Sequence, residues 1–143
     1  MKTIDIVREF YSGVIEKDLD RINAVIDTYF ADDAVVRIPQ SLYYGGEYRG
    51  KPTLKQLFSG LAHPKSAVRA DSMQLERICG SGDSVAAMLS FEWRGRGGDK
   101  LLTKNIEWFT FQEGRIIEIC AFYEDTARCV AVDQAPGDKS QAR

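Results

Sequence analysis

The sequence predicts an α+β fold: a cone-shaped, curved antiparallel sheet wrapped around three N-terminal helices, with a hydrophobic pocket between them. Apolar residues recur at helical spacing in the first part of the chain, whereas side chains alternate as in strands from residue 71 onward. Glycine-containing turns separate these strands at short intervals. A sheet that curves around helices without closing leaves a cavity. We therefore expect one domain over residues 1–133 and a disordered tail over 134–143.

Composition excludes several classes of function. The chain has 143 residues, 44% of them hydrophobic, which is enough for one domain with a core. Its 19 Lys and Arg and 21 Asp and Glu are scattered, so no basic stripe for nucleic acid is present. No apolar run reaches the roughly 18–20 residues of a membrane span. Three cysteines without metal-ligand spacing, and a charged amphipathic start instead of a signal peptide, predict a cytoplasmic protein with reduced thiols.

Three periodic segments predict the helices. Apolar side chains recur three or four positions apart in residues 3–17. Asp18 is suited to cap a second helix, whose apolar stripe continues to Phe30. Pro52 is suited to the first turn of a third helix, and Pro64 ends it.

A short strand and a loop separate the second and third helices. Residues 34–38 change to strand-like spacing, and Pro39 argues against a central position for this strand. Segment 40–50 contains three tyrosines and three glycines without periodicity, which predicts a loop. Two interpretations of this loop stay open: a lid over the pocket, or a contact between subunits.

Four strands are predicted after the helices, at residues 71–79, 84–94, 103–111 and 116–126. The outer face of the last two strands is too apolar to remain exposed to water, so we expect a homodimer through that face. The apolar residues assigned to it are Ile106, Trp108, Ile116 and Phe122.

The last two strands carry two acidic residues among apolar and aromatic neighbours. Strand alternation places Glu107 on one face with Asn105, and Asp125 on one face with Tyr123. A carboxylate in an apolar cavity has a raised pKa, and two carboxylates close together form one base and one proton donor. We predict Glu107 and Asp125 as catalytic residues.

Further residues are predicted to bind substrate. Tyr123 and Asn105 are suited to hold a substrate oxygen by hydrogen bonds. The remaining predicted contacts form apolar walls suited to a ring-shaped molecule: Trp93, Phe91, Phe10, Phe58 and Ile38.

Structural roles for the same residues stay open. Glu107 is equally compatible with a supporting ion pair to an arginine. Asp125, followed by Thr126, is also suited to cap the next segment. The aromatic residues are as typical of a core as of a binding site, and His63 beside a proline is typical of a surface residue.

Four motifs carry a resemblance to a known superfamily: FADDAVV, YRGKPTL, SFEWRGR and FTFQEGRIIEICAFYEDTA. In this order they resemble the nuclear-transport-factor-2-like superfamily over residues 3–130. More narrowly, the chain is similar to ketosteroid isomerases, SnoaL-type polyketide cyclases and limonene epoxide hydrolases. The resemblance implies a cone-like, mostly dimeric fold, a buried hydrophobic pocket with one or two acids, and no metal or organic cofactor.

The resemblance to ketosteroid isomerases implies only one shared catalytic group. Their first-helix tyrosine corresponds to Phe10, their proton-shuttling aspartate to Ile38, and their third-helix tyrosine to Phe58. Only the acid of the oxyanion hole has a counterpart, Glu107. Phenylalanine cannot donate a hydrogen bond and isoleucine cannot move a proton, so steroid isomerisation by that mechanism is not expected.

The other two families match at Asp125. It fits the closing motif of the epoxide hydrolases and corresponds to the late acid–base aspartate of the SnoaL-type cyclases. The Arg-x-Asp of the hydrolases is missing, and the nearby Glu92 and Arg94 fall on the opposite face of the strand.

Three functions remain. The first is a cofactor-free acid–base enzyme, of cyclase, isomerase or dehydratase type, that acts on a small hydrophobic cyclic carbonyl compound in a buried pocket. The second is a non-catalytic domain that binds a hydrophobic ligand or serves as a dimeric scaffold. The third, epoxide hydrolysis, requires Glu92 and Arg94 to face inward.

Overall fold

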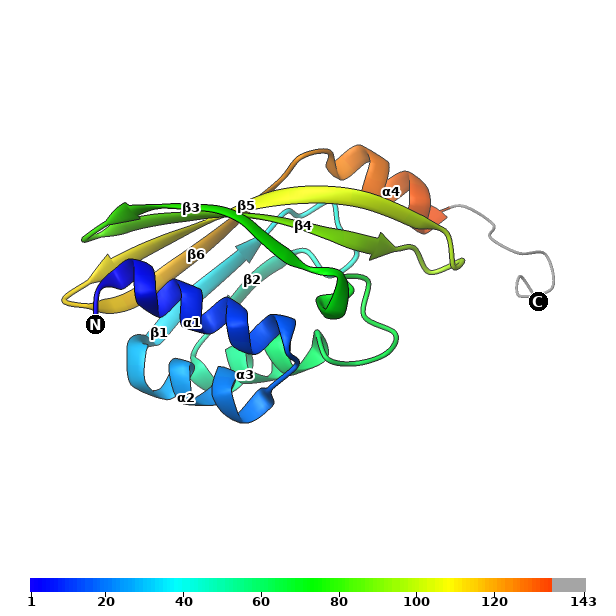
Figure 1. Ribbon diagram of the computed structural model, residues 1–143. Helices are drawn as coiled ribbons and strands as arrows, with labels where there is room; N and C mark the ends of the chain where they lie inside the picture. Colours follow the sequence, from blue (N-terminus) through cyan, green and yellow to red (C-terminus); the bar gives the residue numbers. More distant parts are fainter. Residues whose placement is uncertain (135–143) are drawn as a thin grey trace.

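A computed structural model describes residues 1–134 (Figure 1). The predicted tail, apart from its first residue, lies outside the described residues. The elements follow in the order α1 (Thr3–Ile15), α2 (Leu19–Tyr29), β1 (Phe30–Ile38), β2 (Gly46–Arg49), α3 (Lys51–Gly60), a 3-10 turn (Ala70–Ser72), β3 (Gln74–Ser81), β4 (Ser84–Arg94), β5 (Lys100–Gln112), β6 (Arg115–Tyr123) and α4 (Thr126–Gln134).

The six strands form one curved sheet in the order β2-β1-β6-β5-β4-β3. Helices α1, α2 and α3 lie against its concave face, as the sequence predicted (Figure 1). The core fills the space between these two layers and includes the buried faces of all three helices. Among the described residues, no helix is long and apolar enough to cross a membrane.

The helix boundaries follow the sequence signals. The Asp18 side chain accepts a hydrogen bond from the backbone N–H of Arg21 at 3.1 Å, which confirms it as the cap of α2. Pro52 lies in the first turn of α3. The second helix ends at Tyr29 because the chain enters β1 directly at Phe30.

Strand β1 differs most from its prediction. It begins at Phe30, four residues before the expected start, and lies inside the sheet. It pairs antiparallel with β2 and parallel with β6, so one pairing of the sheet is not antiparallel. Pro39 follows the last residue of the strand, where it interrupts no hydrogen bond of the ladder. The segment predicted as a loop contributes β2.

Alternation along β4 and β5 is confirmed. Val85, Leu89 and Phe91 are at most 1% exposed and point toward the helices. The prediction for Ile116 was wrong: it is completely buried on the concave side. An irregularity between Thr110 and Phe111 shifts the register there, so Ile116 faces Phe111 in the core.

The opposite face of the sheet is exposed and partly apolar. Side chains on β5 and β6 that point away from the helices retain much of their surface: Leu102 78%, Ile106 42%, Trp108 45% and Phe122 57%.

Candidate active site

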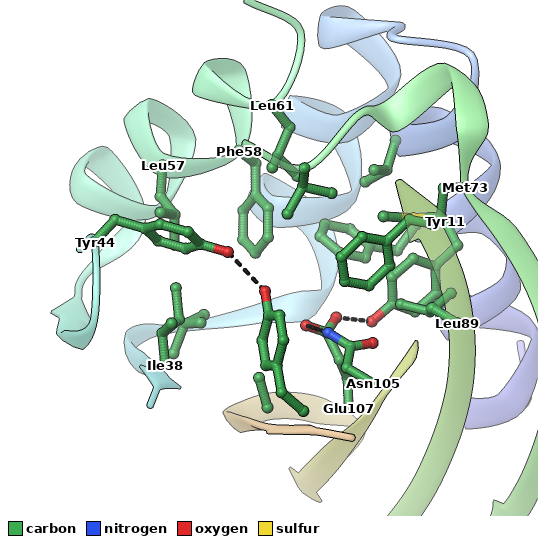
Figure 2. Close-up of a pocket in the computed structure, with 17 residues that line it drawn as sticks. Tyr11, Ile38, Tyr44, Leu57, Phe58, Leu61, Met73, Leu89, Asn105 and Glu107 are labelled. Atoms are coloured by element: carbon green, nitrogen blue, oxygen red, sulfur yellow. Dashed lines mark hydrogen bonds between the residues drawn. The ribbon is translucent and has the colours of Figure 1, made fainter. Parts of the chain in front are cut away.

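A small cavity lies between the helices and the concave face of the sheet, and Figure 2 shows the side chains that line it. Its free volume is about 50 Å³, enough for a few water molecules, each of which needs roughly 10–15 Å³ by this measure. The lining is apolar except for two groups of polar side chains. A ring-shaped ligand therefore needs the walls to move outward.

The first polar group is centred on Glu107. The alternation of β5 directs Asn105 and Glu107 to the concave face, and α1 directs Tyr11 toward them (Figure 2). The hydroxyl of Tyr11 donates to Oε1 of Glu107. The Asn105 Nδ2 donates to Oε2 over a long 3.4 Å, while its buried Oδ1 has no partner among the described residues.

The surroundings of Glu107 change its acidity. The Glu107 side chain is half-buried, and its carboxylate borders the cavity. Burial raises the pKa of Glu107 above its ordinary value, and the hydrogen bonds from Tyr11 and Asn105 oppose this by stabilising the charged form. Burial also raises the pKa of Tyr11 well above its usual range, and the charge of Glu107 adds to this. Tyr11 therefore remains a hydrogen-bond donor.

The second polar group is a pair of phenols. The hydroxyls of Tyr44, from the β1–β2 connection, and Tyr123, from the end of β6, lie 2.6 Å apart (Figure 2). Burial raises the pKa of both phenols, so both stay protonated at ordinary pH.

Most of the predicted contacts line this cavity. Besides Glu107, Asn105 and Tyr123, the lining contains the predicted wall residues Phe10, Phe58, Phe91 and Ile38. Trp93 does not reach the cavity. It lies fully buried behind Tyr44, with ring centroids 5.7 Å apart and nearly parallel planes, and its Nε1 donates to Asp133 of α4 at 3.3 Å.

The placement predicted for Asp125 was wrong. Its carboxylate accepts a hydrogen bond from the backbone N–H of Arg128 at 3.1 Å, and it does not line the cavity. Strand β6 ends at Tyr123, so alternation no longer orients residue 125. The capping interpretation is the one that the structure supports, because helix α4 begins at Thr126.

The condition for epoxide hydrolysis is not met. Glu92 and Arg94 do not line the cavity, and their side chains approach each other to 3.7 Å on the other side of β4. His63 is exposed and accepts a hydrogen bond at Nδ1 from the backbone N–H of Lys65. Within residues 1–134, no cluster of three His, Cys, Asp or Glu side chains is arranged to hold a metal ion.

Sequence reasoning missed two polar residues of the cavity, Tyr11 and Tyr44. It assigned the tyrosine position of the isomerases to Phe10, whereas α1 directs the neighbouring Tyr11 to Glu107. Tyr11 lies within the helix predicted over residues 3–17, but a tyrosine among apolar side chains is also typical of a core residue. Tyr44 lies in a segment without periodicity, so no pattern indicated its direction.

Comparisons with known proteins agree with this architecture. Residues 7–119 match the family described as SnoaL-like domain. No curated protein matches the chain.

Solved structures share the fold at low sequence identity. A protein of unknown function with a cystatin-like fold from Xanthomonas campestris is 21% identical, with a TM-score of 0.69 over 91% of this chain and 97% of that one. A SnoaL-like polyketide cyclase candidate from Jannaschia sp. CCS1 is 14% identical (TM-score 0.70, 94% and 93%). TerC, co-crystallised with polyporic acid, is 18% identical (TM-score 0.71, 93% and 98%).

Proposed function

Because the chain belongs to the SnoaL-like domain family, within the nuclear-transport-factor-2-like superfamily, we propose that it is an acid–base enzyme of cyclase, isomerase or dehydratase type. Its substrate is a small hydrophobic cyclic carbonyl compound, and no cofactor takes part. The observation that carries this proposal is Glu107, a half-buried carboxyl group at the wall of an otherwise largely apolar cavity.

The two oxygens of Glu107 have different surroundings, which supports a role as base. Oε1 accepts the hydrogen bond from Tyr11, whereas Oε2 has only the long contact with Asn105. Oε2 therefore keeps a lone pair for a proton of the substrate. A raised pKa brings the group closer to neutral pH, where an acid–base catalyst works best.

The walls of the cavity favour a flat apolar substrate. Phe10 and Phe58 border the cavity from the helices, and Phe91 and Ile38 border it from the sheet. General acid–base catalysis contributes about 10²- to 10⁴-fold, which is enough for a carbon whose proton is already acidic next to a carbonyl. This role is assigned to Glu107 alone, since Asp125 caps α4.

Deuterium exchange tests the proposal without knowledge of the product. Cyclic ketones and cyclic β-dicarbonyl compounds are incubated with the protein in D₂O, and uptake of deuterium next to the carbonyl is followed by NMR. We expect exchange above the buffer rate, and a loss of at least about 10²-fold in Glu107→Gln. Asp125→Asn, which alters a carboxylate outside the cavity, is the matched control. Equal exchange by wild type and Glu107→Gln would refute the proposal.

A non-catalytic ligand-binding domain is the second candidate. The apolar residues Ile38 and Phe58, at positions where the isomerases carry catalytic groups, favour it. Polyporic acid, the ligand co-crystallised with TerC, is a suitable probe. Binding of this probe in calorimetry, together with no Glu107-dependent exchange across the panel, would favour this alternative.

We also propose that the protein is a homodimer through the outer face of the sheet. Ile106, Trp108 and Phe122 lie exposed together there on β5 and β6. Burying such side chains against a second copy removes apolar surface from water. Sedimentation should give a dimer that Phe122→Glu converts to monomer, whereas a monomeric wild type would exclude this interface.

A further inference from the structure

We propose that the hydroxyls of Tyr44 and Tyr123 form a clamp for the carbonyl oxygen of the substrate, and that this clamp receives the negative charge when Glu107 removes a proton. The inference rests on the proposed function and narrows its substrate class. The substrate is a flat ring compound that places its carbonyl oxygen at the clamp and the C–H next to that carbonyl at Glu107. We call these two hydroxyls the phenol clamp.

The phenol clamp has an unused donor. Two hydroxyls 2.6 Å apart share one hydrogen bond, so the proton of the second phenol is free for another acceptor. A ligand oxygen that inserts between them receives a hydrogen bond from each. Two donors on one oxygen stabilise an enolate more than a neutral carbonyl, because hydrogen bonds to a charged acceptor are the stronger ones.

The connection that carries Tyr44 is held firmly in position. Leu42 anchors it in the core with 3% exposure, and the Gly45 N–H donates to the Leu42 carbonyl at 2.8 Å. The Tyr48 hydroxyl donates to the backbone carbonyl of Tyr44 at 2.5 Å. Tyr44 also stacks on Trp93. The donor is thus oriented before any ligand enters, as catalysis by a fixed dipole requires.

A movement of the Tyr44 side chain would also enlarge the cavity. Tyr123 belongs to the central strand β6, whereas Tyr44 lies on a connection between two strands. Among the residues that the structure describes, their single hydrogen bond is the polar link between them. A ligand oxygen that takes over this bond lets the Tyr44 side chain turn away from Tyr123, while its backbone stays in place and both phenols keep a partner.

Sheet register places the phenol clamp apart from Glu107. Glu107 lies opposite Ala121, and Tyr123 lies two residues further along β6, opposite Asn105. Diagonal neighbours of this kind have Cβ atoms somewhat less than about 7–8 Å apart. The Tyr123 ring carries its hydroxyl further from the sheet. The two polar groups therefore face one cavity from different points, as a ring with two reacting positions requires.

The proposed step balances in atoms and charge. A C–H bond next to the carbonyl breaks, and its proton forms an O–H bond with Oε2 of Glu107. The electron pair of that bond moves to form C=C, and the carbonyl oxygen becomes an enolate held by Tyr44 and Tyr123. The cavity carries one negative charge before and after. In a substrate with a second C=C conjugated to the enolate, return of the proton to the far carbon of that bond completes an isomerisation.

The experiment uses 4-nitrophenol, whose ionised form absorbs at longer wavelength, as a mimic of the enolate. Binding is measured in the Glu107→Gln background, which removes the acid–base group and leaves the phenol clamp. Near neutral pH the free probe is a mixture of both forms, and we expect the bound probe to be shifted toward the ionised one. Adding Tyr44→Phe or Tyr123→Phe should weaken binding about tenfold or more and abolish the shift.

Tyr43→Phe is the matched control, because Tyr43 neighbours Tyr44 but does not line the cavity. It should change affinity less than about twofold. The proposal is overturned if the probe binds in its neutral form, if it does not bind at millimolar concentration, or if the Tyr44 and Tyr123 variants match the control. The deuterium-exchange assay in wild type separates the two proposals. If exchange depends on Glu107 but the probe test fails, the phenol clamp is refuted and the acid–base function of Glu107 stands.

Discussion

Replacing Tyr11 with phenylalanine removes one hydroxyl from the cavity and leaves the ring in place. Tyr11 is 2% exposed, and its ring packs edge-on against Phe10 and Phe109 with centroids 5.4 and 5.7 Å away. These apolar contacts persist in Tyr11→Phe. The change therefore isolates the hydrogen bond that Tyr11 donates to Glu107.

The cost of Tyr11→Phe depends on the charge of Glu107. A hydrogen bond to a charged group contributes about 1.5–3 kcal/mol, and one between neutral groups about 0.5–1.5 kcal/mol. Its loss penalises the carboxylate more than the acid, so the variant raises the pKa of Glu107 beyond the increase that burial already causes. A folded pKa above the unfolded one means that the native state binds more protons, so stability falls as pH rises between the two values. In the variant this fall continues to higher pH.

Urea denaturation at pH 5 and pH 8 measures the difference. We expect Tyr11→Phe to lose about 1 kcal/mol more free energy of unfolding at pH 8 than at pH 5. The pH midpoint of Glu107-dependent exchange should also move upward. Equal destabilisation at both pH values, or an unchanged midpoint, would refute the role of Tyr11 in setting the acidity of Glu107. In a Glu107→Gln background the effect of Tyr11→Phe should lose its pH dependence, and Tyr29→Phe on α2 is a control for removal of a hydroxyl.

Three further predictions concern other positions. Glu107→Gln should reduce the fall of wild-type stability as pH rises above the ordinary carboxyl pKa of 4.5, which urea titrations at several pH values would detect; the raised pKa of Asp133 accounts for a remaining part of the fall. Asp125→Ala should cost about 0.5–2 kcal/mol of stability through loss of the α4 cap, yet leave deuterium exchange within about twofold; a large loss of exchange would contradict its assignment as a cap. Gly45→Ala places a Cβ 2.0 Å from the carbonyl oxygen of Pro39, so the loop that carries Tyr44 must change shape. Binding of 4-nitrophenol should then weaken about as much as in Tyr44→Phe, and unchanged binding would show that the shape of this loop does not matter.

Periodicity predicted those parts of the fold in which one face is buried. The alternation of β4 and the stripes of α1 and α2 report burial directly, because a single face of each packs on the core. Pairing between distant segments produces no periodic pattern in the sequence. The parallel contact of β1 with β6 depends on the path of the whole chain, and the irregularity near Thr110 moved Ile116 to the other face without a change in composition.

The candidate site was predictable where a side chain lies within a regular strand. Glu107 and Asn105 follow the alternation of β5, so their direction could be derived. Asp125 lies just after β6, where alternation ends. Its side chain caps the next helix by accepting a hydrogen bond from the backbone N–H of Arg128. Tyr44 depends on the shape of a short irregular connection, which composition does not specify.

The parallel contact between β1 and β6 also constrains how the protein is made. Val36 pairs with Ile119, so one edge of β1 has no partner until β6 leaves the ribosome. During synthesis that edge is open to pairing with other nascent chains, so it needs protection from aggregation. Because Val36 on β1 and Ala121 on β6 both line the cavity, a ligand can stabilise this protein only after β6 has been synthesised.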